Sequence, residues 1–292
     1  MGFADDLCWV STVRMKRIKT YSIVGEAEDV GAVEKIVSRL LEKSADPDVL
    51  LVVGGDGVIL DPEIKAEALK RPVLRVHHRP NSLKSLGFAA DVNLSNLEQA
   101  LKDLKEGDYS FEDVGLLKCR VVDGGVESPV GFALVDVDVE AHRRGSCIMF
   151  RTVVRRPDGS EERLPTPKCT GAVVTGPYGS TAWNLALGGP VAVDPEFRCL
   201  LVNLREAPVK PDKFLASGDC RIEITVLEDA VVKMDRDELA LRKGQTLAVG
   251  TDDEDPCRVR FVRTLHTRES LMDKLLRFSR FQYGRVSEGE ES

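Results

Sequence analysis

Apolar residues recur along this chain with two different spacings, and the change in spacing divides it into two parts. Between residues 16 and 111, short continuous apolar runs alternate with stretches whose apolar residues return every three or four positions. The first pattern is typical of buried strands and the second of amphipathic helices, so we expect an α/β arrangement in this part. The strands are predicted over 17–24, 49–53 and 73–76, and the helices over 29–43, 62–70 and 94–106.

After about residue 111, short β segments replace the helical pattern. In residues 257–261 apolar and polar side chains alternate cleanly, which is typical of a sheet with one face in water. A last helix is predicted over 269–279 from its apolar face. The expected organisation is an α/β domain over 16–111 and a β-rich domain over 112–266. The predicted β segments are 116–122, 129–139, 148–154, 172–175, 221–227, 231–234 and 258–262.

The most informative run is the strand at 49–53, because glycines and one acid follow it directly. Five consecutive apolar residues predict a strand that is buried on both faces of a parallel sheet. Gly54, Gly55 and Gly57 allow a sharp turn and a close approach to a ligand, with N–H groups available for phosphate oxygens. Asp56 lies among them, at the strand end where ligands bind in open α/β sheets. Two interpretations stay open: an ordinary turn, or a carboxylate that deprotonates a hydroxyl or holds a metal–nucleotide complex.

A second stretch that is rich in glycine covers residues 175–190. A strand at 173–174 leads into it, and Ser180 or Thr181 is expected to cap a short helix that Gly188-Gly189-Pro190 ends. A helix start behind a glycine turn is a suitable place for an anion. An ordinary strand–helix corner would use the same residues, so this alternative also stays open.

The composition narrows the classes of function. A net charge of −7 does not favour binding to nucleic acid or to an anionic membrane, and no apolar run is long enough to cross a membrane. The N-terminus lacks a secretory pattern, so we expect a cytoplasmic protein. The seven cysteines include no Cys-x-x-Cys pair, which predicts reduced core cysteines and no protein-bound metal or redox site.

Both glycine-rich stretches carry a resemblance to one family. Gly54-Gly55-Asp56-Gly57 resembles a signature of the NAD kinase family, which diacylglycerol-type lipid kinases and phosphofructokinases share more distantly. The run from Gly179 to Trp183, followed by Gly-Gly-Pro, is similar to a second NAD kinase element that those other kinases lack. Leu86-Gly87-Phe88 resembles the turn that lies over the nucleotide pocket in the family.

The resemblance covers most of residues 16–280 and implies the fold and the activity of the family. The implied fold is a Rossmann-like parallel sheet, then a mainly β domain, and a C-terminal helix over 267–280 that returns to the first domain. The implied reaction transfers a phosphoryl group from ATP to the 2′-hydroxyl of the adenosine ribose of NAD. It implies Mg²⁺ with the ATP, because charge must be neutralised at the β and γ oxygens, and it implies homodimers or tetramers.

The resemblance also assigns roles to residues. It implies that Asp56 is the general base, that Asp136 binds hydroxyls of the acceptor, and that aromatic side chains flank the ring systems. The residues that it implies in nucleotide or substrate binding are Gly54, Gly55, Gly57, Phe88, Asp136, Thr170, Tyr178, Gly179, Ser180, Thr181, Ala182 and Trp183.

Some positions depart from the family pattern and leave the acceptor open. Val135 replaces an asparagine, Thr170 stands where the family has an aspartate, and Tyr178 replaces a small hydroxyl residue. A buried polar group without its partner costs about 1–3 kcal/mol, which is roughly one to two orders of magnitude in affinity. Three hypotheses remain: an NAD kinase, a related kinase for a small polyol or another nucleotide, and a nucleotide-binding regulator without catalysis. The phosphoryl donor, ATP or polyphosphate, is open as well.

Overall fold

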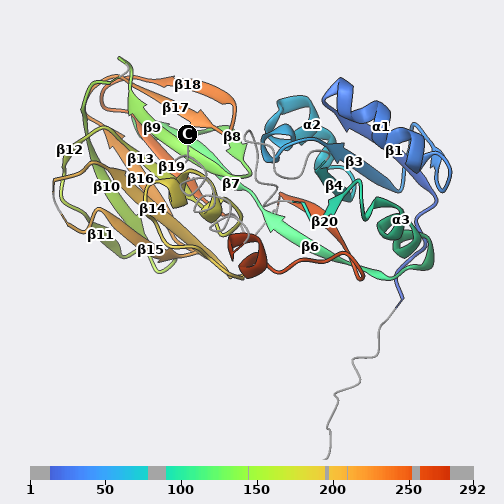
Figure 1. Ribbon diagram of the computed structural model, residues 1–292. Coiled ribbons are helices and arrows are strands. Elements are labelled where there is room, and N and C mark those ends of the chain that lie inside the picture. Colours follow the sequence, from blue (N-terminus) through green and yellow to red (C-terminus); the bar gives the residue numbers. More distant parts are fainter. Residues whose placement is uncertain are drawn as a thin grey trace, which may run out of the picture.

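The computed structural model describes residues 14–77, 90–143, 145–194, 197–208, 210–251 and 257–276. The described part of the chain forms two lobes, one around sheet 1 and one made of sheets 2 and 3 (Figure 1). No helix among these residues is long and apolar enough to span a membrane.

Sheet 1 is mostly parallel. Its order is β2-β1-β3-β4-β20-β6, with β5 beside β4, and only the β20–β6 pair is antiparallel. The strands are β1 (Thr20–Gly25), β2 (Glu42–Lys43), β3 (Val49–Val53), β4 (Val73–His77), β5 (Val92–Asn93), β6 (Tyr109–Gly115) and β20 (Arg258–Thr264).

Helices cover both faces of this sheet, so the prediction that β3 is buried on both faces is confirmed. Val49, Leu51 and Val53 pack with α1 (Ala27–Val37) and α3 (Leu97–Glu106). Leu50 and Val52 face the 3₁₀ helix η1, the helix α2 and apolar residues of the second lobe. Of the helices on this face, η1 spans Asp56–Leu60 and α2 spans Pro62–Ala68.

Local signals set the start of α2, as the sequence predicts. The Asp61 carboxylate accepts hydrogen bonds from the N–H groups of Glu63 (3.1 Å) and Ile64 (3.4 Å), and Pro62 occupies the first helical position. Tertiary pairing instead limits α1, which ends at Val37 rather than at residue 43. Residues 42 and 43 pair with β1 as the edge strand β2.

Sheets 2 and 3 are antiparallel and enclose one core between them. Sheet 2 has the order β11-β10-β16-β19-β7-β8, with β12 beside β10, and sheet 3 has the order β15-β14-β13-β9-β17-β18. The strands of sheet 2 are β7 (Leu117–Asp123), β8 (Val126–Ala133), β10 (Ile148–Arg155), β11 (Glu161–Arg163), β12 (Lys168–Cys169), β16 (Arg221–Val226) and β19 (Thr246–Gly250). Those of sheet 3 are β9 (Asp136–Ala141), β13 (Gly171–Thr175), β14 (Cys199–Arg205), β15 (Lys213–Ser217), β17 (Ala230–Met234) and β18 (Asp237–Leu241).

Three local predictions about the second half need correction. The segment 258–262 is a strand as predicted, but it pairs within sheet 1 rather than with the later β segments. The segment 129–139 forms two strands in different sheets, because the chain passes from sheet 2 to sheet 3 at Leu134 and Val135. The division into domains at residue 111 stays a prediction.

The third correction concerns the short helix after the second glycine turn. Neither Ser180 nor Thr181 caps it: α4 (Trp183–Ala186) starts after Ala182 without a side-chain cap. The Ser180 hydroxyl is used elsewhere, because its oxygen accepts a hydrogen bond from the Ala192 N–H at 3.1 Å.

Candidate active site

The candidate site starts at the carboxyl end of β3, where the chain turns sharply into η1. Gly54 has a φ of +134°, and a Cβ at this position would lie 2.7 Å from a methyl carbon of Val58. Glycine is therefore required here. Gly55 directly precedes η1 and Gly57 lies in its first turn, where backbone N–H groups find no acceptor within the helix. The Asp56 side chain is 32% exposed, so its carboxylate can be reached from solvent.

A buried arginine lies directly behind this turn. Arg75 of β4 donates from Nη2 to the Gly55 carbonyl oxygen at 3.1 Å, and the same nitrogen is 3.8 Å from Oδ1 of Asp56. Its side chain is only 2% exposed. Two of its nitrogens, Nε and Nη1, have no hydrogen-bond partner among the described residues. Because buried N–H groups without a partner are costly, these nitrogens indicate room for water or a ligand oxygen.

The second glycine turn comes from the other lobe and meets the first one. Tyr178 begins the 3₁₀ helix η2 (Tyr178–Thr181), and its ring stacks on Phe261 of β20, with centroids 5.2 Å apart. Burial raises the pKa of Tyr178 to about 12; Arg75 opposes this rise and Asp56 adds to it. Tyr178 also packs against the apolar cluster that contains Val58 and Ile59 of η1, so the two turns meet although they are far apart in sequence.

Backbone atoms of Val135 lock the second turn in place. The Thr175 hydroxyl donates to the Val135 carbonyl oxygen at 2.5 Å. A Cβ at Gly179 would lie only 2.0 Å from the same oxygen. Any side chain at Gly179 would therefore push the turn away from Val135 and Asp136.

Asp136 follows at the start of β9 and lies near a second buried carboxylate. Burial, together with the charges of Asp235 and Asp138, raises the pKa of Asp136 to about 7. Asp235 occupies the turn between β17 and β18, and its backbone N–H donates to the Asp136 carbonyl oxygen at 3.1 Å. At neutral pH, Asp136 can thus both donate and accept a hydrogen bond, which suits a ligand hydroxyl.

The Asp235 carboxylate joins the two lobes. It accepts hydrogen bonds from the N–H groups of Leu134 (2.8 Å) and Val135 (2.9 Å). It also pairs at 3.1 Å with Lys65 of α2, and the side chains of Lys65 and Asp235 are 3% and 0% exposed. This buried pair holds the helix after the first glycine turn against the strands that carry Asp136.

The other predicted site residues lie at different depths. Trp183 is 45% exposed beside Thr181 and Ala182, whereas Ser180 is buried and bound to the loop that follows α4. Thr170 precedes β13, five residues from Thr175, so at 3.3 Å per residue it lies roughly 16 Å from the Asp136 end of the sheet. The structure therefore does not bring Thr170 together with the others. Phe88 lies outside the described residues.

Sequence patterns did not point to Arg75, Lys65 or Asp235. A charged residue inside the apolar run 73–76 was the available signal for Arg75. Lys65 and Asp235 gave no signal, because only the fold brings together side chains that are 170 residues apart.

The residues do not form a metal site by themselves. Within the described ranges, no three histidine, cysteine, aspartate or glutamate side chains are grouped to hold an ion. Mg²⁺ usually needs only one or two carboxylates when nucleotide phosphates supply the other ligands. Asp56 suits this arrangement, since it is a reachable carboxylate beside N–H groups that are open to phosphate.

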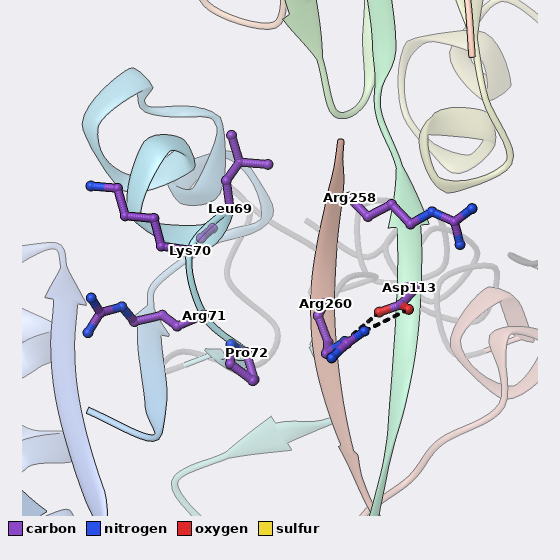
Figure 2. A pocket seen from close by; sticks show the side chains of 8 residues that line it. Leu69, Lys70, Arg71, Pro72, Asp113, Arg258 and Arg260 are labelled. Atoms are coloured by element: carbon purple, nitrogen blue, oxygen red, sulfur yellow. Dashed lines mark hydrogen bonds and ion pairs between the residues drawn. The ribbon is translucent and has the colours of Figure 1, made fainter. Parts of the chain in front are cut away.

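A distinct pocket of about 520 Å³ opens at the opposite end of sheet 1. Residues 68–72, which precede β4, form one wall, and Asp113, Arg258 and Arg260 form the other (Figure 2). Arg260 is bound to Asp113 there at 2.8 Å and 3.2 Å. Despite its size, this pocket is not the candidate site, because Asp56 follows the carboxyl ends of these strands and the pocket lies at their amino ends.

Known proteins resemble the chain in sequence and in fold. It is 31% identical over 264 residues to the NAD kinase of Methanopyrus kandleri, covering 88% of this chain and 87% of that protein. It is 33% identical over 205 residues to the NAD kinase of Heliobacterium modesticaldum, covering 68% and 67%. No family model matches the chain.

Two solved structures share its fold. The yeast NADH kinase complexed with NADH superposes with a TM-score of 0.69 at 14% identity, covering 85% of this chain and 84% of that one. The NAD kinase from Archaeoglobus fulgidus in complex with ATP superposes with a TM-score of 0.64 at 22% identity, covering 84% and 93%.

Proposed function

Because this chain belongs to the NAD kinase family, we propose that it transfers the γ-phosphoryl group of ATP to the 2′-hydroxyl of the adenosine ribose of NAD. The products are NADP and ADP. The observation that carries the proposal is the meeting of two glycine turns from different lobes around one partly exposed carboxylate, Asp56.

In the proposed reaction, Asp56 takes the proton of the 2′-hydroxyl as its oxygen attacks the γ-phosphorus. A new P–O bond forms, the bond between the γ-phosphorus and the β,γ-bridging oxygen breaks, and its electron pair leaves with ADP. Arg75 orients the turn through the Gly55 carbonyl and offers positive charge behind the carboxylate. Asp56 is the carboxylate that would hold Mg²⁺ arriving with ATP, and the ion would supply positive charge to the phosphate oxygens.

The rest of the site would bind the two nucleotides. The N–H groups of Gly55 and Gly57 suit phosphate oxygens. Asp136, which can donate and accept near neutral pH, suits a ribose hydroxyl. Trp183 presents a half-exposed ring on which a base can stack.

The proposal also covers the cellular location and the oligomeric state of the protein. We infer that it is a cytoplasmic homo-oligomer, a dimer or a tetramer. The described cysteines are free thiols, which supports a reducing compartment. Light scattering on the purified protein measures its mass in solution, and a monomer would contradict the assembly.

The test is the formation of NADP from NAD and ATP. Asp56→Asn is expected to lower kcat by about 10²–10⁴-fold, because it removes the general base but keeps the shape of the side chain. Glu63→Gln is the matched control, since Glu63 is an exposed acid on α2 outside the site. Full activity of Asp56→Asn would remove Asp56 from its role. Turnover of a polyol or another nucleotide, with none of NAD, would show that the acceptor is wrong.

A further inference from the structure

A hairpin turn of sheet 3 places an exposed arginine over the first glycine turn. The two-residue turn Asp235-Arg236 joins β17 to β18, where Met234 pairs with Asp237. A methyl group added at Gly57 would lie 3.5 Å from Nη2 of Arg236. The guanidinium therefore lies beside the Gly57 backbone, next to Asp56, although it comes from the other lobe.

Buried contacts of Asp235, the residue before Arg236, fix the position of the turn. Asp235 has a φ of +56°, which is uncommon for a residue other than glycine. Its carboxylate is held by Lys65 and by the N–H groups of Leu134 and Val135. The turn that presents Arg236 is thus anchored on both lobes, so Arg236 needs no fixed partner of its own.

Arg236 has no ion pair or hydrogen bond within the described ranges. Its neighbours in the turn are different, because Asp235 and Asp237 both contact Lys65. An arginine that is exposed, unpaired and next to N–H groups that are open to phosphate is suited to an anion.

We propose that Arg236 is a catalytic residue that binds the oxygens of the γ-phosphoryl group during its transfer. This role rests on the proposed kinase reaction. Asp56 holds the attacking hydroxyl on one side, Arg75 supplies charge behind the turn, and Arg236 faces the same turn from the second lobe. Charge that spreads over the equatorial oxygens in the transition state is stabilised by such a guanidinium.

Steady-state kinetics of Arg236→Ala test the role. We expect kcat to fall about 10²-fold, the size of effect seen when one preorganised donor is removed, while the KM for NAD stays unchanged. Arg236→Lys is expected to recover only part of the loss, because an ammonium cannot form two parallel hydrogen bonds with phosphate. Arg242→Ala is the matched control: Arg242 is an exposed arginine that follows the same hairpin, and its loss should leave kcat unchanged. An unchanged kcat in Arg236→Ala would overturn the proposal.

A binding measurement separates this proposal from the choice of acceptor. Inorganic tripolyphosphate contains the phosphate chain of the donor and no nucleoside, and its affinity is measured by calorimetry. Arg236→Ala should weaken it about tenfold, as expected for the loss of one charged contact. If the wild type forms no NADP but binds tripolyphosphate more tightly than Arg236→Ala, the acceptor is wrong and Arg236 keeps its phosphate role. If the wild type forms NADP, and Arg236→Ala has the same kcat and the same affinity for tripolyphosphate as the wild type, the phosphate role of Arg236 is rejected.

Discussion

Two groups of cations lie at opposite ends of sheet 1, and they differ in how far carboxylates already bind them. At the amino ends, in the pocket of Figure 2, Arg260 is bound to Asp113, while Lys70 and Arg71 share Glu67 at 2.7 Å and 3.8 Å. At the carboxyl ends, Arg75 is almost completely buried with two unpartnered nitrogens, and Arg236 is exposed without a partner in the described residues.

The comparison shows why the size of a pocket does not identify a site. In this pocket Lys70, Arg71 and Arg260 are already paired with carboxylates, and an anion would have to displace those carboxylates first; of the lining cations, only Arg258 has no ion pair in the described residues. Cations that keep N–H donors without a partner, as Arg75 does at Nε and Nη1, favour a ligand that carries negative charge. The four predictions below test this difference, from the largest expected effect to the smallest.

The largest effect on stability is expected at the Lys65–Asp235 pair, which anchors the cations at the carboxyl ends of the sheet 1 strands. Lys65→Met leaves the Asp235 carboxylate buried without its cation, and we expect the free energy of unfolding to fall by about 3–5 kcal/mol. Urea unfolding measures it. Lys70→Met is the matched control just after the same helix, since Lys70 forms only an exposed pair with Glu67. Equal losses in both variants would mean that the Lys65–Asp235 pair does not anchor the site.

A smaller effect is expected from the second glycine turn. Gly179→Ala places a methyl group 2.0 Å from the Val135 carbonyl oxygen, so the turn must move. Overpacking of this kind costs about 1–3 kcal/mol, and we expect kcat/KM for NAD to fall as well. Gly176→Ala in the same turn is the control, because the nearest atom to a Cβ there is 4.0 Å away. If the two variants unfold at the same urea concentration, the close approach at Gly179 does not constrain the turn.

Much of sheet 1 could be predicted from the sequence because its signals are local. The apolar run of β3, the Asp61-Pro62 start of α2 and the periodic face of α3 each depend on neighbours in the chain. The pairing of β20 with β4 and β6 could not be predicted, because Phe261 pairs with Val73, 188 positions away, and with Glu112, 149 positions away. Alternation shows that residues 257–261 form a strand, but not which sheet the strand enters.

The candidate site shows the same limit. Gly54–Gly57 and Gly179 are visible in the sequence, because turns and close approaches require glycine. The cations could not be assigned in advance: Lys65, Arg75 and Arg236 are single charges in different elements. Their roles depend on what lies opposite them in space. The two predicted acids, Asp56 and Asp136, did have local signals, and their roles in the site stay predictions.

The pH dependence of stability is expected to report the environment of Asp136. Its pKa is raised from 3.8 to about 7 in the folded protein, so between these values the folded state keeps a proton that the unfolded state loses. The free energy of unfolding therefore falls as pH rises through this window, by at most about 1.4 kcal/mol per pH unit, and levels off above pH 7. Asp136→Asn removes this contribution. The variant should gain stability relative to the wild type between pH 5 and pH 7, and parallel curves from urea unfolding would contradict the raised pKa.

The smallest effect is expected at the amino-end pocket. Arg260→Met removes an ion pair whose side chains are 51% and 33% exposed, so we expect the free energy of unfolding to change by at most about 1 kcal/mol. Because the pocket lies at the end of sheet 1 opposite Asp56, NADP formation should stay at the wild-type rate. Asp56→Asn, measured in the same assay, gives the loss of kcat that is expected for a residue at the carboxyl ends of the strands. If Arg260→Met lowered kcat as strongly as Asp56→Asn, the neutralised cations would belong to the catalytic machinery and the contrast between the two ends would be wrong.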